Sequence, residues 1–214
     1  MTLSYIVSGF AVGLLVGMTG VGGGSLMTPL LTLLFGVPPS VAVGTDLAFA
    51  SITKSAGTLT HRLRGTVRWD IVKRLCIGAL PAAVIATLAL KSFGTLSPEI
   101  GQIIRYSIAG SVLLTVVALI FKGRMLAWIN AHPEKQLQGN KLAAATIISG
   151  AVLGVLVTVS SIGAGAIGAT LLVMLYPRMS SAEVAGTDIA YAVPLTAIAA
   201  LGHWWLGSIH WELL

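Results

Sequence analysis

The fold is decided by the stretch GMTGVGGG at residues 17–24, in which five of the eight residues are glycine. It separates two apolar runs, residues 9–16 and 25–36, that can each form a helix. A glycine costs a helix about 1 kcal/mol relative to alanine, so the stretch itself is a poor helix. A phosphate-binding loop would need a preceding strand and a following lysine, and the sequence has neither here. In a membrane, unwound glycine-rich backbone between two half-helices lines a cavity, and we adopt this interpretation.

The composition is that of a polytopic membrane protein. Of the 214 residues, 56% are hydrophobic and only 9% are charged, and the mean hydropathy is +0.93. Ordinary soluble domains carry about 25% charged residues. Lys and Arg in cytoplasmic loops explain the net charge of +6, so no nucleic-acid partner is needed. The single cysteine, Cys76, lies in an apolar run, and the first span lacks the basic start of a cleaved signal peptide.

The sequence predicts an all-α protein whose apolar spans alternate with short loops. The predicted spans are 3–18, 25–36, 41–60, 71–91, 105–122, 142–159, 165–176 and 184–206. A complete crossing takes about 20 residues, so the short spans 25–36 and 165–176 are predicted to be half-helices. Two loops are rich in Lys and Arg, residues 61–74 and 122–141. Because two full spans separate them, both are expected on the cytoplasmic side.

The chain contains an internal repeat. SVAVGTDLAF at 40–49 matches AEVAGTDIAY at 182–191, which lies 142 positions later. The same spacing relates His61 to His203, Gly65 to Gly207 and Trp69 to Trp211. A spacing of 141 relates Gly9 to Gly150, Gly13 to Gly154, Gly22 to Gly163 and Gly24 to Gly165. So many ordered matches indicate two related halves.

The second copy is predicted to be inverted in the membrane. The counterpart of span 3–18 is the span at 142–159, five spans later, and an odd number reverses the orientation. The basic loop 61–74 corresponds to residues 203–214, which contain no Lys or Arg, as expected on the opposite face. We therefore expect a first repeat at 1–122, a cytoplasmic linker at 123–141 and a second repeat at 142–214. Residues 73–91 have no counterpart, so we expect a copy that is shortened at its C-terminus.

This arrangement predicts two broken helices that meet near the membrane midplane, at residues 17–24 and 160–165. Half-helix N-termini present free N–H groups and a positive dipole end, which favour a small oxyanion. Serine, threonine and lysine side chains add hydrogen-bond donors. The predicted substrate-binding residues are Gly22, Gly23, Gly24, Ser25, Thr45, Lys54, Ser160, Ser161, Gly163, Gly165 and Thr187.

Three ionisable residues fall inside predicted spans, namely Asp46, Lys54 and Asp188. A charge in the bilayer is costly, so such residues are functional candidates by default. The two aspartates occupy matching GTD motifs, and the alternative role for each is to cap the start of a helix. Lys54 either reaches the membrane surface or an ion-pair partner, or contacts the substrate. Two carboxylates and one ammonium leave an excess negative charge, so proton coupling through Asp46 and Asp188 is expected.

His61 and His203 end their spans at opposite faces of the membrane, too far apart to share a metal ion. They are candidates for gates or proton relays, with packing at the membrane boundary as the alternative. The sequence shows no catalytic nucleophile with its base, no metal cluster and no nucleotide motif. We therefore expect no enzyme activity, no cofactor and no bound metal.

These residues together resemble the TauE/SafE family of membrane transporters. The resemblance rests on GMTGVGGGSLMTPLL at 17–31, AVGTDLAF at 42–49, TKSAG at 53–57, SSIGAGAIG at 160–168 and AGTDIAYAVPLTAIAALGHWW at 185–205. The chain departs from the pattern at the second break, where Ala164 stands in place of the glycine at position 23. The resemblance implies an inner-membrane carrier that moves small sulfur oxyanions or organosulfonates.

The leading functional hypothesis is a multi-pass secondary carrier of the plasma membrane that exports a sulfite-like anion with proton coupling. An anion channel on the same fold is the alternative, and voltage-driven flux that ignores a pH gradient would favour it. A membrane enzyme or a chaperone-like insertion factor is a third class, and the missing catalytic constellation argues against the enzyme. The expected partners are the anion and the lipid bilayer, with a homodimer as an option.

Overall fold

The computed structural model describes residues 9–14, 24–92, 98–132 and 136–211, and every regular element in these ranges is a helix. The elements are α2 (Gly24–Leu33), α3 (Pro39–Leu63), α4 (Trp69–Ser92), α5 (Pro98–Ala131), α6 (Gly139–Ser160), α7 (Ala166–Leu175) and α8 (Ser181–Trp205). Residues 9–14 are also helical. The predicted all-α fold class is confirmed.

Four of the described helices, α4, α5, α6 and α8, are long and apolar enough to cross a membrane. Helix α3 has 25 residues and matches them in length, but it carries Asp46, Lys54 and several Ser and Thr side chains. The four apolar helices cover the spans predicted at 71–91, 105–122, 142–159 and 184–206. Helix α5 continues to Ala131, so the first part of the predicted linker 123–141 is helical.

Local sequence explains where the helices begin. Helix α3 starts directly after Pro38 with Pro39 at its first position, where the missing N–H of proline costs nothing. Helix α8 starts with a capping box, in which the Ser180 hydroxyl accepts from the Glu183 amide and the Glu183 carboxylate accepts from the Ser180 amide.

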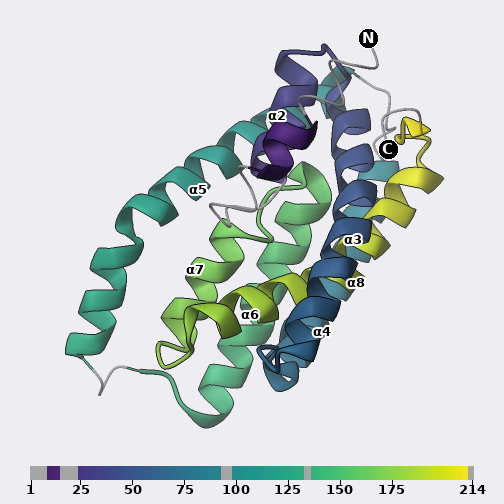
Figure 1. Ribbon diagram of the computed structural model, residues 1–214. Coiled ribbons are helices and arrows are strands. Elements are labelled where there is room, and N and C mark those ends of the chain that lie inside the picture. The colour runs from purple at the N-terminus through teal and green to yellow at the C-terminus, as the bar shows by residue number, and fades with distance from the viewer. Residues whose placement is uncertain (1–8, 15–23, 93–97, 133–135, 212–214) are drawn as a thin grey trace.

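Helices α2 and α7 are the two half-helices that the sequence predicts. Each has 10 residues and is therefore about 15 Å long, half the thickness of a hydrocarbon core of about 30 Å. They run in opposite directions away from the middle of the molecule, α2 upward and α7 downward in the view of Figure 1. The break before α7 is non-helical from Ser161 to Gly165. Residues 17–23 of the first predicted break lie outside the described residues.

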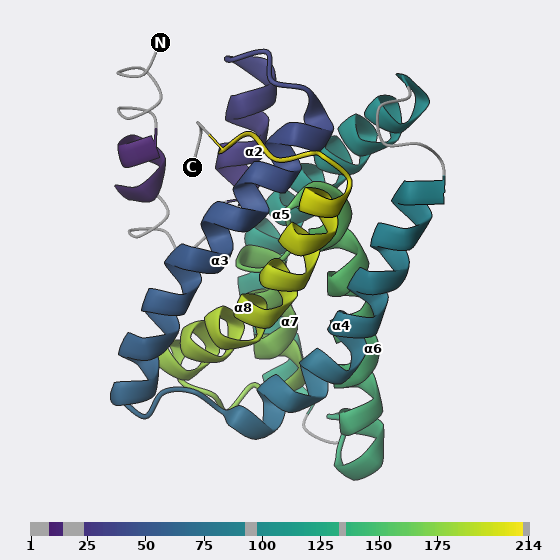
Figure 2. The same cartoon turned by 90° about the vertical axis from the view of Figure 1, so that its right-hand side faces the viewer.

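Helices α3 and α8 carry the two GTD motifs and lie side by side with opposite chain directions (Figures 1 and 2). Two equivalent hydrogen bonds connect each of these helices to the segment that follows the other helix. The Arg68 amide donates to Thr187 Oγ1 at 3.1 Å, and the His210 amide donates to Thr45 Oγ1 at 3.0 Å. Both donors and both acceptors are 142 positions apart in the sequence. The two bonds are therefore one contact made twice.

The glycines of the GTD motifs show the same reciprocity. A Cβ atom on Gly44 would collide with the Ser208 carbonyl, and one on Gly186 would lie 2.7 Å from the Thr66 carbonyl. Ser208 is the counterpart of Thr66 at the same spacing of 142. These contacts support the repeat interpretation. The orientation of each copy in a membrane stays a prediction.

Helices α4 and α6 pack with their backbones unusually close, and Figure 2 shows them side by side. A Cβ atom on Gly150 would collide with the Leu75 carbonyl, and one on Gly154 with the Ala79 carbonyl. From the other helix, a Cβ atom on Gly78 would collide with the Ile147 carbonyl. Small residues allow this close approach, which gains van der Waals contact where lipid supplies no hydrophobic driving force.

We expect Gly150→Ala to destabilise the protein by about 1–3 kcal/mol, because its methyl group forces α4 and α6 apart. Gly110→Ala on α5 is the matched control, since nothing lies within 4 Å of its Cβ position. The control should be neutral or stabilising by up to about 1 kcal/mol. Thermal unfolding in detergent measures both. Equal midpoints for the two variants would contradict the close packing of α4 on α6.

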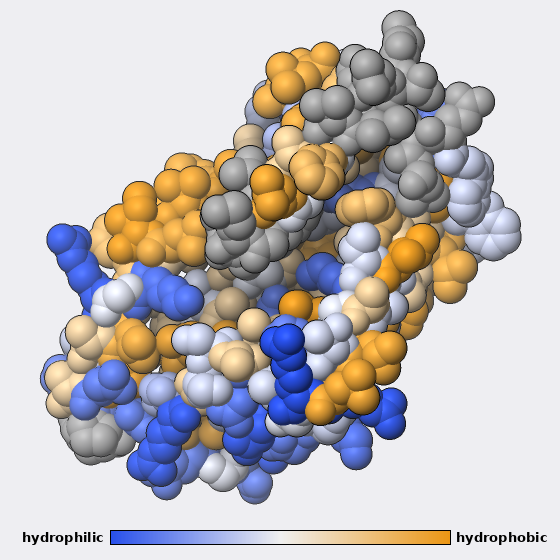
Figure 3. Space-filling model, viewed as in Figure 1, coloured by the Kyte–Doolittle hydropathy of each residue, from blue (hydrophilic) through white to orange (hydrophobic). Residues whose placement is uncertain are grey.

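Hydrophilic side chains gather at the lower end of the face in Figure 3, where the α3–α4 turn and the α5–α6 connection lie in Figure 1. By the positive-inside rule, we expect this end to be cytoplasmic. We expect a cysteine at Arg64 to react from the cytoplasmic side and one at His210 from the other side, both in a Cys76→Ser background. Both positions are exposed. Labelling with a membrane-impermeant maleimide, in intact and in opened cells, tests this topology, and reaction of both from one face would exclude it.

Candidate functional site

The second helix break has a backbone that few sequences can adopt. Ser161, which ends α6, has a left-handed φ of 58°, and Gly163 and Gly165 have φ values of 138° and 135°. Glycine reaches such values without steric cost, which explains its use here. Gly165 precedes α7, whose start has no side-chain cap. The Gly168 amide of the first turn donates to the Gly163 carbonyl, and the N–H groups of Ala166 and Ile167 before it form a positive helix end inside the protein.

Lys54 brings a cation to this break from the other repeat. Its Nζ donates a hydrogen bond to the Ala164 carbonyl at 3.2 Å, and the side chain is partly buried. The ammonium therefore lies at the break rather than reaching along α3 to the membrane surface. A lysine from α3 and the N-terminal end of α7 thus combine their positive potential at one place.

Asp188 on α8 lies beside the same helix end, and only 3% of it is exposed. The Gly165 amide faces its carboxylate, and Lys54 interacts with it electrostatically. A Cβ atom on Gly168 would collide with Asp188 Oδ1 and would lie 2.8 Å from the Tyr191 hydroxyl. Among the described residues, Asp188 Oδ1 and the Tyr191 hydroxyl have no hydrogen-bond partner. The carboxylate therefore occupies the position where an anion would meet the start of α7.

Asp46 on α3 links the two halves of the site, and only 1% of it is exposed. Its Oδ2 accepts a hydrogen bond of 2.7 Å from the Thr28 hydroxyl on the half-helix α2. The Ser161 hydroxyl of the second break also faces this carboxylate. Lys54 interacts electrostatically with Asp46 as well as with Asp188, and the described residues form no direct ion pair between them.

Neither aspartate caps the helix that carries it. Helix α3 begins at Pro39 and α8 at Ser181, so Asp46 and Asp188 each lie about two turns inside their helices. The cap of α8 is Ser180 instead. Capping of their own helices is therefore wrong as an account of the GTD aspartates, whereas the Asp188 carboxylate faces a backbone amide at the start of α7. Two buried carboxylates beside one ammonium carry an uncompensated negative charge, which one bound proton would neutralise.

Other predicted substrate residues have hydrogen bonds elsewhere. The Thr45 and Thr187 hydroxyls accept the two bonds between the repeats. Ser160 Oγ lies 2.7 Å from the Leu156 carbonyl and 3.1 Å from Ser111 Oγ, and it accepts from the Ile162 amide. Of the first break, Gly24 begins α2, while Gly22, Gly23 and the Ser25 side chain lie outside the described residues. Contact of these residues with an anion stays a prediction.

The two candidate gate histidines make local contacts in equivalent places. His203 is 1% exposed, and its Nε2 donates to the Thr158 carbonyl at 2.9 Å. His61 Nδ1 lies 2.8 Å from Thr66 Oγ1. Each histidine also packs at the GTD glycine of the other repeat, His61 through its ring Nδ1 at Gly186 and His203 through its Cβ at Gly44. These contacts match the packing alternative, and a gating role stays a prediction.

The sequence analysis did not identify three residues of the site. Thr28 is fully buried and binds Asp46, while Gly168 and Tyr191 enclose the Asp188 carboxylate. A signal was available for Tyr191, because the repeat aligns it with Phe49 at the spacing of 142. Tyr191 thus carries a hydroxyl where the matched residue of the first repeat has a plain phenyl ring. Because a buried hydroxyl needs a hydrogen-bond partner, such a difference indicates a polar site.

A buried set of charges at a helix break, shared by two related halves of an all-helical bundle, is the architecture of a membrane transporter. The comparisons with known proteins give the same class. The family model described as sulfite exporter TauE/SafE matches residues 5–214, and the chain belongs to this family.

Two relatives match nearly the whole chain. The probable membrane transporter protein YjnA of Bacillus subtilis (strain 168) is 35% identical over 213 residues, which is 100% of this chain and 83% of the relative. YdhB of the same organism, also a probable membrane transporter protein, is 26% identical over 211 residues, 96% of this chain and 80% of the relative.

A plant relative matches a smaller part. The sulfite exporter TauE/SafE family protein 5 of Arabidopsis thaliana is 31% identical over 141 residues, 63% of this chain and 30% of the relative. No solved structure matches. The chain is thus similar to membrane transporters rather than to enzymes, and it is a multi-pass membrane protein.

The charge set predicts a compensating pair of mutations. Lys54→Met leaves two buried carboxylates without their cation, and breaking a buried charge pair costs about 3–5 kcal/mol. Adding Asp188→Asn removes one of these carboxylates, so the double variant should recover most of the lost stability. Lys54→Met combined with Asp70→Asn is the control, because Asp70 is exposed. Thermal unfolding in detergent measures the coupling, and equal midpoints for the two double variants would show that Lys54 and Asp188 do not interact.

Proposed function

We propose that the protein is a secondary carrier of the plasma membrane that exports a small sulfur oxyanion or organosulfonate with proton coupling. The observation that carries the proposal is the hydrogen bond from Lys54 to the Ala164 carbonyl, at the N-terminal end of α7. An ammonium and a helix N-terminus together favour a compact anion with hydrogen-bond acceptors on several sides. The family supplies the sulfite-like class of substrate.

The coupling follows from competition at the start of α7. An ionised Asp188 is itself an anion at this position, where the Gly165 amide faces it. A substrate anion entering beside it would meet like-charge repulsion as well as the attraction of Lys54. A proton on Asp188 removes the repulsion, so the proton and the anion favour each other's binding. Loss of the proton then helps to expel the anion. Because the proton and the anion move together in this scheme, export is driven by the outward gradient of the anion and carries protons outward with it.

Asp46 extends this coupling to the half-helix α2. Its bond to the Thr28 hydroxyl ties α2 to α3, and the Ser161 hydroxyl beside it belongs to the second break. A change in the charge of Asp46 therefore acts on both half-helices at once. In the proposed cycle we therefore assign Asp46 to the conformational change and Asp188 to anion binding.

The proposal is tested by flux measurements in proteoliposomes. Sulfite, thiosulfate, sulfate and an organosulfonate are compared with and without an imposed pH gradient. A carrier of the proposed kind moves at least one of the sulfur anions faster when the gradient is present. Flux that follows membrane voltage and ignores the pH gradient would identify an anion channel instead.

We expect Asp188→Asn and Asp46→Asn each to abolish proton-driven flux while anion binding is largely retained. Asparagine keeps the size and the hydrogen bonding of aspartate but fixes the neutral form. Anion binding to Asp188→Asn should also lose most of its pH dependence, because the competing charge is gone. Asp70→Asn serves as the control, since this exposed residue lies outside the site. Parental flux and parental pH dependence in both site variants would exclude a coupling role.

A further inference from the structure

A groove on the membrane-facing side of the protein is not part of the transport site. It has a volume of about 710 Å³ and lies between the half-helix α2 and the first half of α5. Pro29 and Leu33 of α2, Pro38 of the following loop, and Arg105, Ala109 and Val112 of α5 are among its lining residues. Figures 1 and 2 show α2 beside this part of α5.

The groove is apolar except at one end, where Arg105 lines it. Arg105 is exposed and has no ion pair or hydrogen bond among the described residues. The other described cation at this end of the bundle, Lys91, is engaged, because its Nζ lies 3.4 Å from the centre of the Trp205 ring. The guanidinium of Arg105 is therefore a positive charge without a partner among the described residues, at the mouth of a mainly apolar groove.

The charge pattern of α5 gives the depth of Arg105 in the membrane. Residues 106–121 contain no charge, and Lys122 follows them. The distance from Arg105 to Lys122 along the helix is about 26 Å at 1.5 Å per residue, close to the roughly 30 Å of a hydrocarbon core. The two cations therefore lie at the two headgroup levels. The α2–α3 loop also lines the groove near Arg105, as expected at a membrane surface.

We propose that this groove binds an anionic phospholipid, with the phosphate on Arg105 and an acyl chain along Ala109, Val112 and Val116. An arginine fork matches phosphate oxygens in a bidentate way, and free cations at the headgroup level attract anionic lipids. The acyl chain fills an apolar groove whose outer rim includes Leu113, 65% exposed, and Val116, 45% exposed. A neutral lipid would leave the Arg105 charge without a partner.

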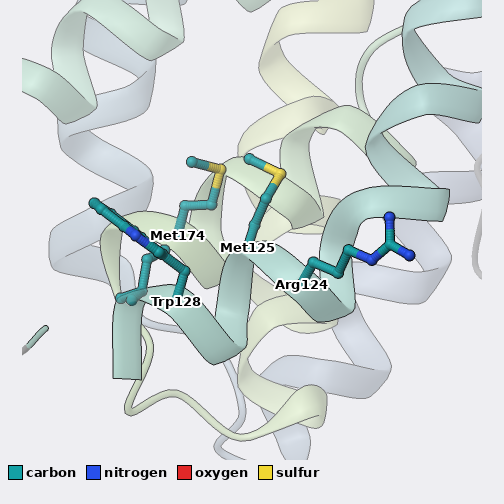
Figure 4. A pocket seen from close by; sticks show the side chains of 5 residues that line it. Arg124, Met125, Trp128 and Met174 are labelled. Carbon is teal, nitrogen blue, oxygen red and sulfur yellow. The ribbon is translucent and has the colours of Figure 1, made fainter. Parts of the chain in front are cut away.

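A cavity at the opposite end of α5 also lies near an arginine, but the arginine side chain is not directed into it. A second cavity of about 460 Å³ is lined there by Arg124, Met125, Trp128, Ile129 and Met174. In Figure 4 the Arg124 side chain points away from Met125, Met174 and Trp128. Its guanidinium lies 5.7 Å from the centre of the Phe121 ring. Arg124 therefore borders the cavity with its guanidinium beside Phe121 and directed away from the methionine and tryptophan side chains.

The bound lipid would act on the transport site through α2. Pro29 and Leu33 face the groove, and Thr28 of the same half-helix binds Asp46. A chain packed between α2 and α5 supports α2 in the position that makes this bond. The lipid site itself does not depend on which anion is transported or on whether transport is proton-coupled.

The test is native mass spectrometry of the delipidated full chain with added phosphatidylglycerol, and with phosphatidylcholine as the neutral probe. The parent should bind one phosphatidylglycerol saturably and in preference to phosphatidylcholine. Arg105→Gln, which removes the charge, and Ala109→Trp, which fills the groove, should each weaken this binding at least tenfold. Arg64→Gln and Ala127→Trp are the matched controls at exposed positions outside the groove, and they should bind like the parent.

Two results would overturn the proposal. The first is unchanged phosphatidylglycerol binding by folded Arg105→Gln and Ala109→Trp proteins. The second is efficient disulfide-linked dimer formation by Leu113→Cys in a Cys76→Ser background, which would show that a second copy of the chain covers the groove. Because lipid binding is measured without transport, a failed flux experiment and a failed lipid experiment remain distinguishable.

Discussion

The arrangement depends on one contact, the Lys54 ammonium held against the Ala164 carbonyl at the start of α7. An isolated ammonium in a low-dielectric interior is very costly, so its position must be supported by negative partners. The carbonyl supplies one partner, and Asp46 and Asp188 supply the electrostatic remainder. The break, the two buried carboxylates and the crossing of α3 with α8 all serve to bring these groups within range of one another.

The crossing itself is held by a contact made twice. Each GTD threonine accepts an amide hydrogen from the segment that follows the helix of the other repeat. Each neighbouring glycine leaves room for that segment's carbonyl. The three adjacent residues of the motif therefore have different roles. Glycine permits the close approach of the segment from the other repeat, threonine accepts its hydrogen bond, and aspartate carries the charge. This division explains why the motif occurs as a unit in both halves.

Much of this could be predicted from the sequence because the signals are local or repeated. Span lengths gave the half-helices α2 and α7, and the intramembrane charges gave Asp46, Lys54 and Asp188. Whether Lys54 reaches the surface or the second break could not be predicted, because the answer depends on how α3 packs against the break before α7. The same holds for Thr28 and for Tyr191, whose partners come from distant parts of the chain. The hydrogen bonds that Thr45 and Thr187 accept could not be predicted either, because their donors, the His210 and Arg68 amides, belong to the other repeat.

The repeat is symmetric in its backbone contacts but not in its charges. Thr196 stands where the second repeat would carry the counterpart of Lys54, and its hydroxyl donates to the Ala192 carbonyl of its own helix. The Asp188 side therefore has a cation and a free helix end, whereas Asp46 is bound to the Thr28 hydroxyl. Under the proposed function, an anion attracted by positive potential would meet Lys54 at the second break. The two halves would then contribute unequally to one anion site, while the gradients of the anion and the proton set the direction of net transport.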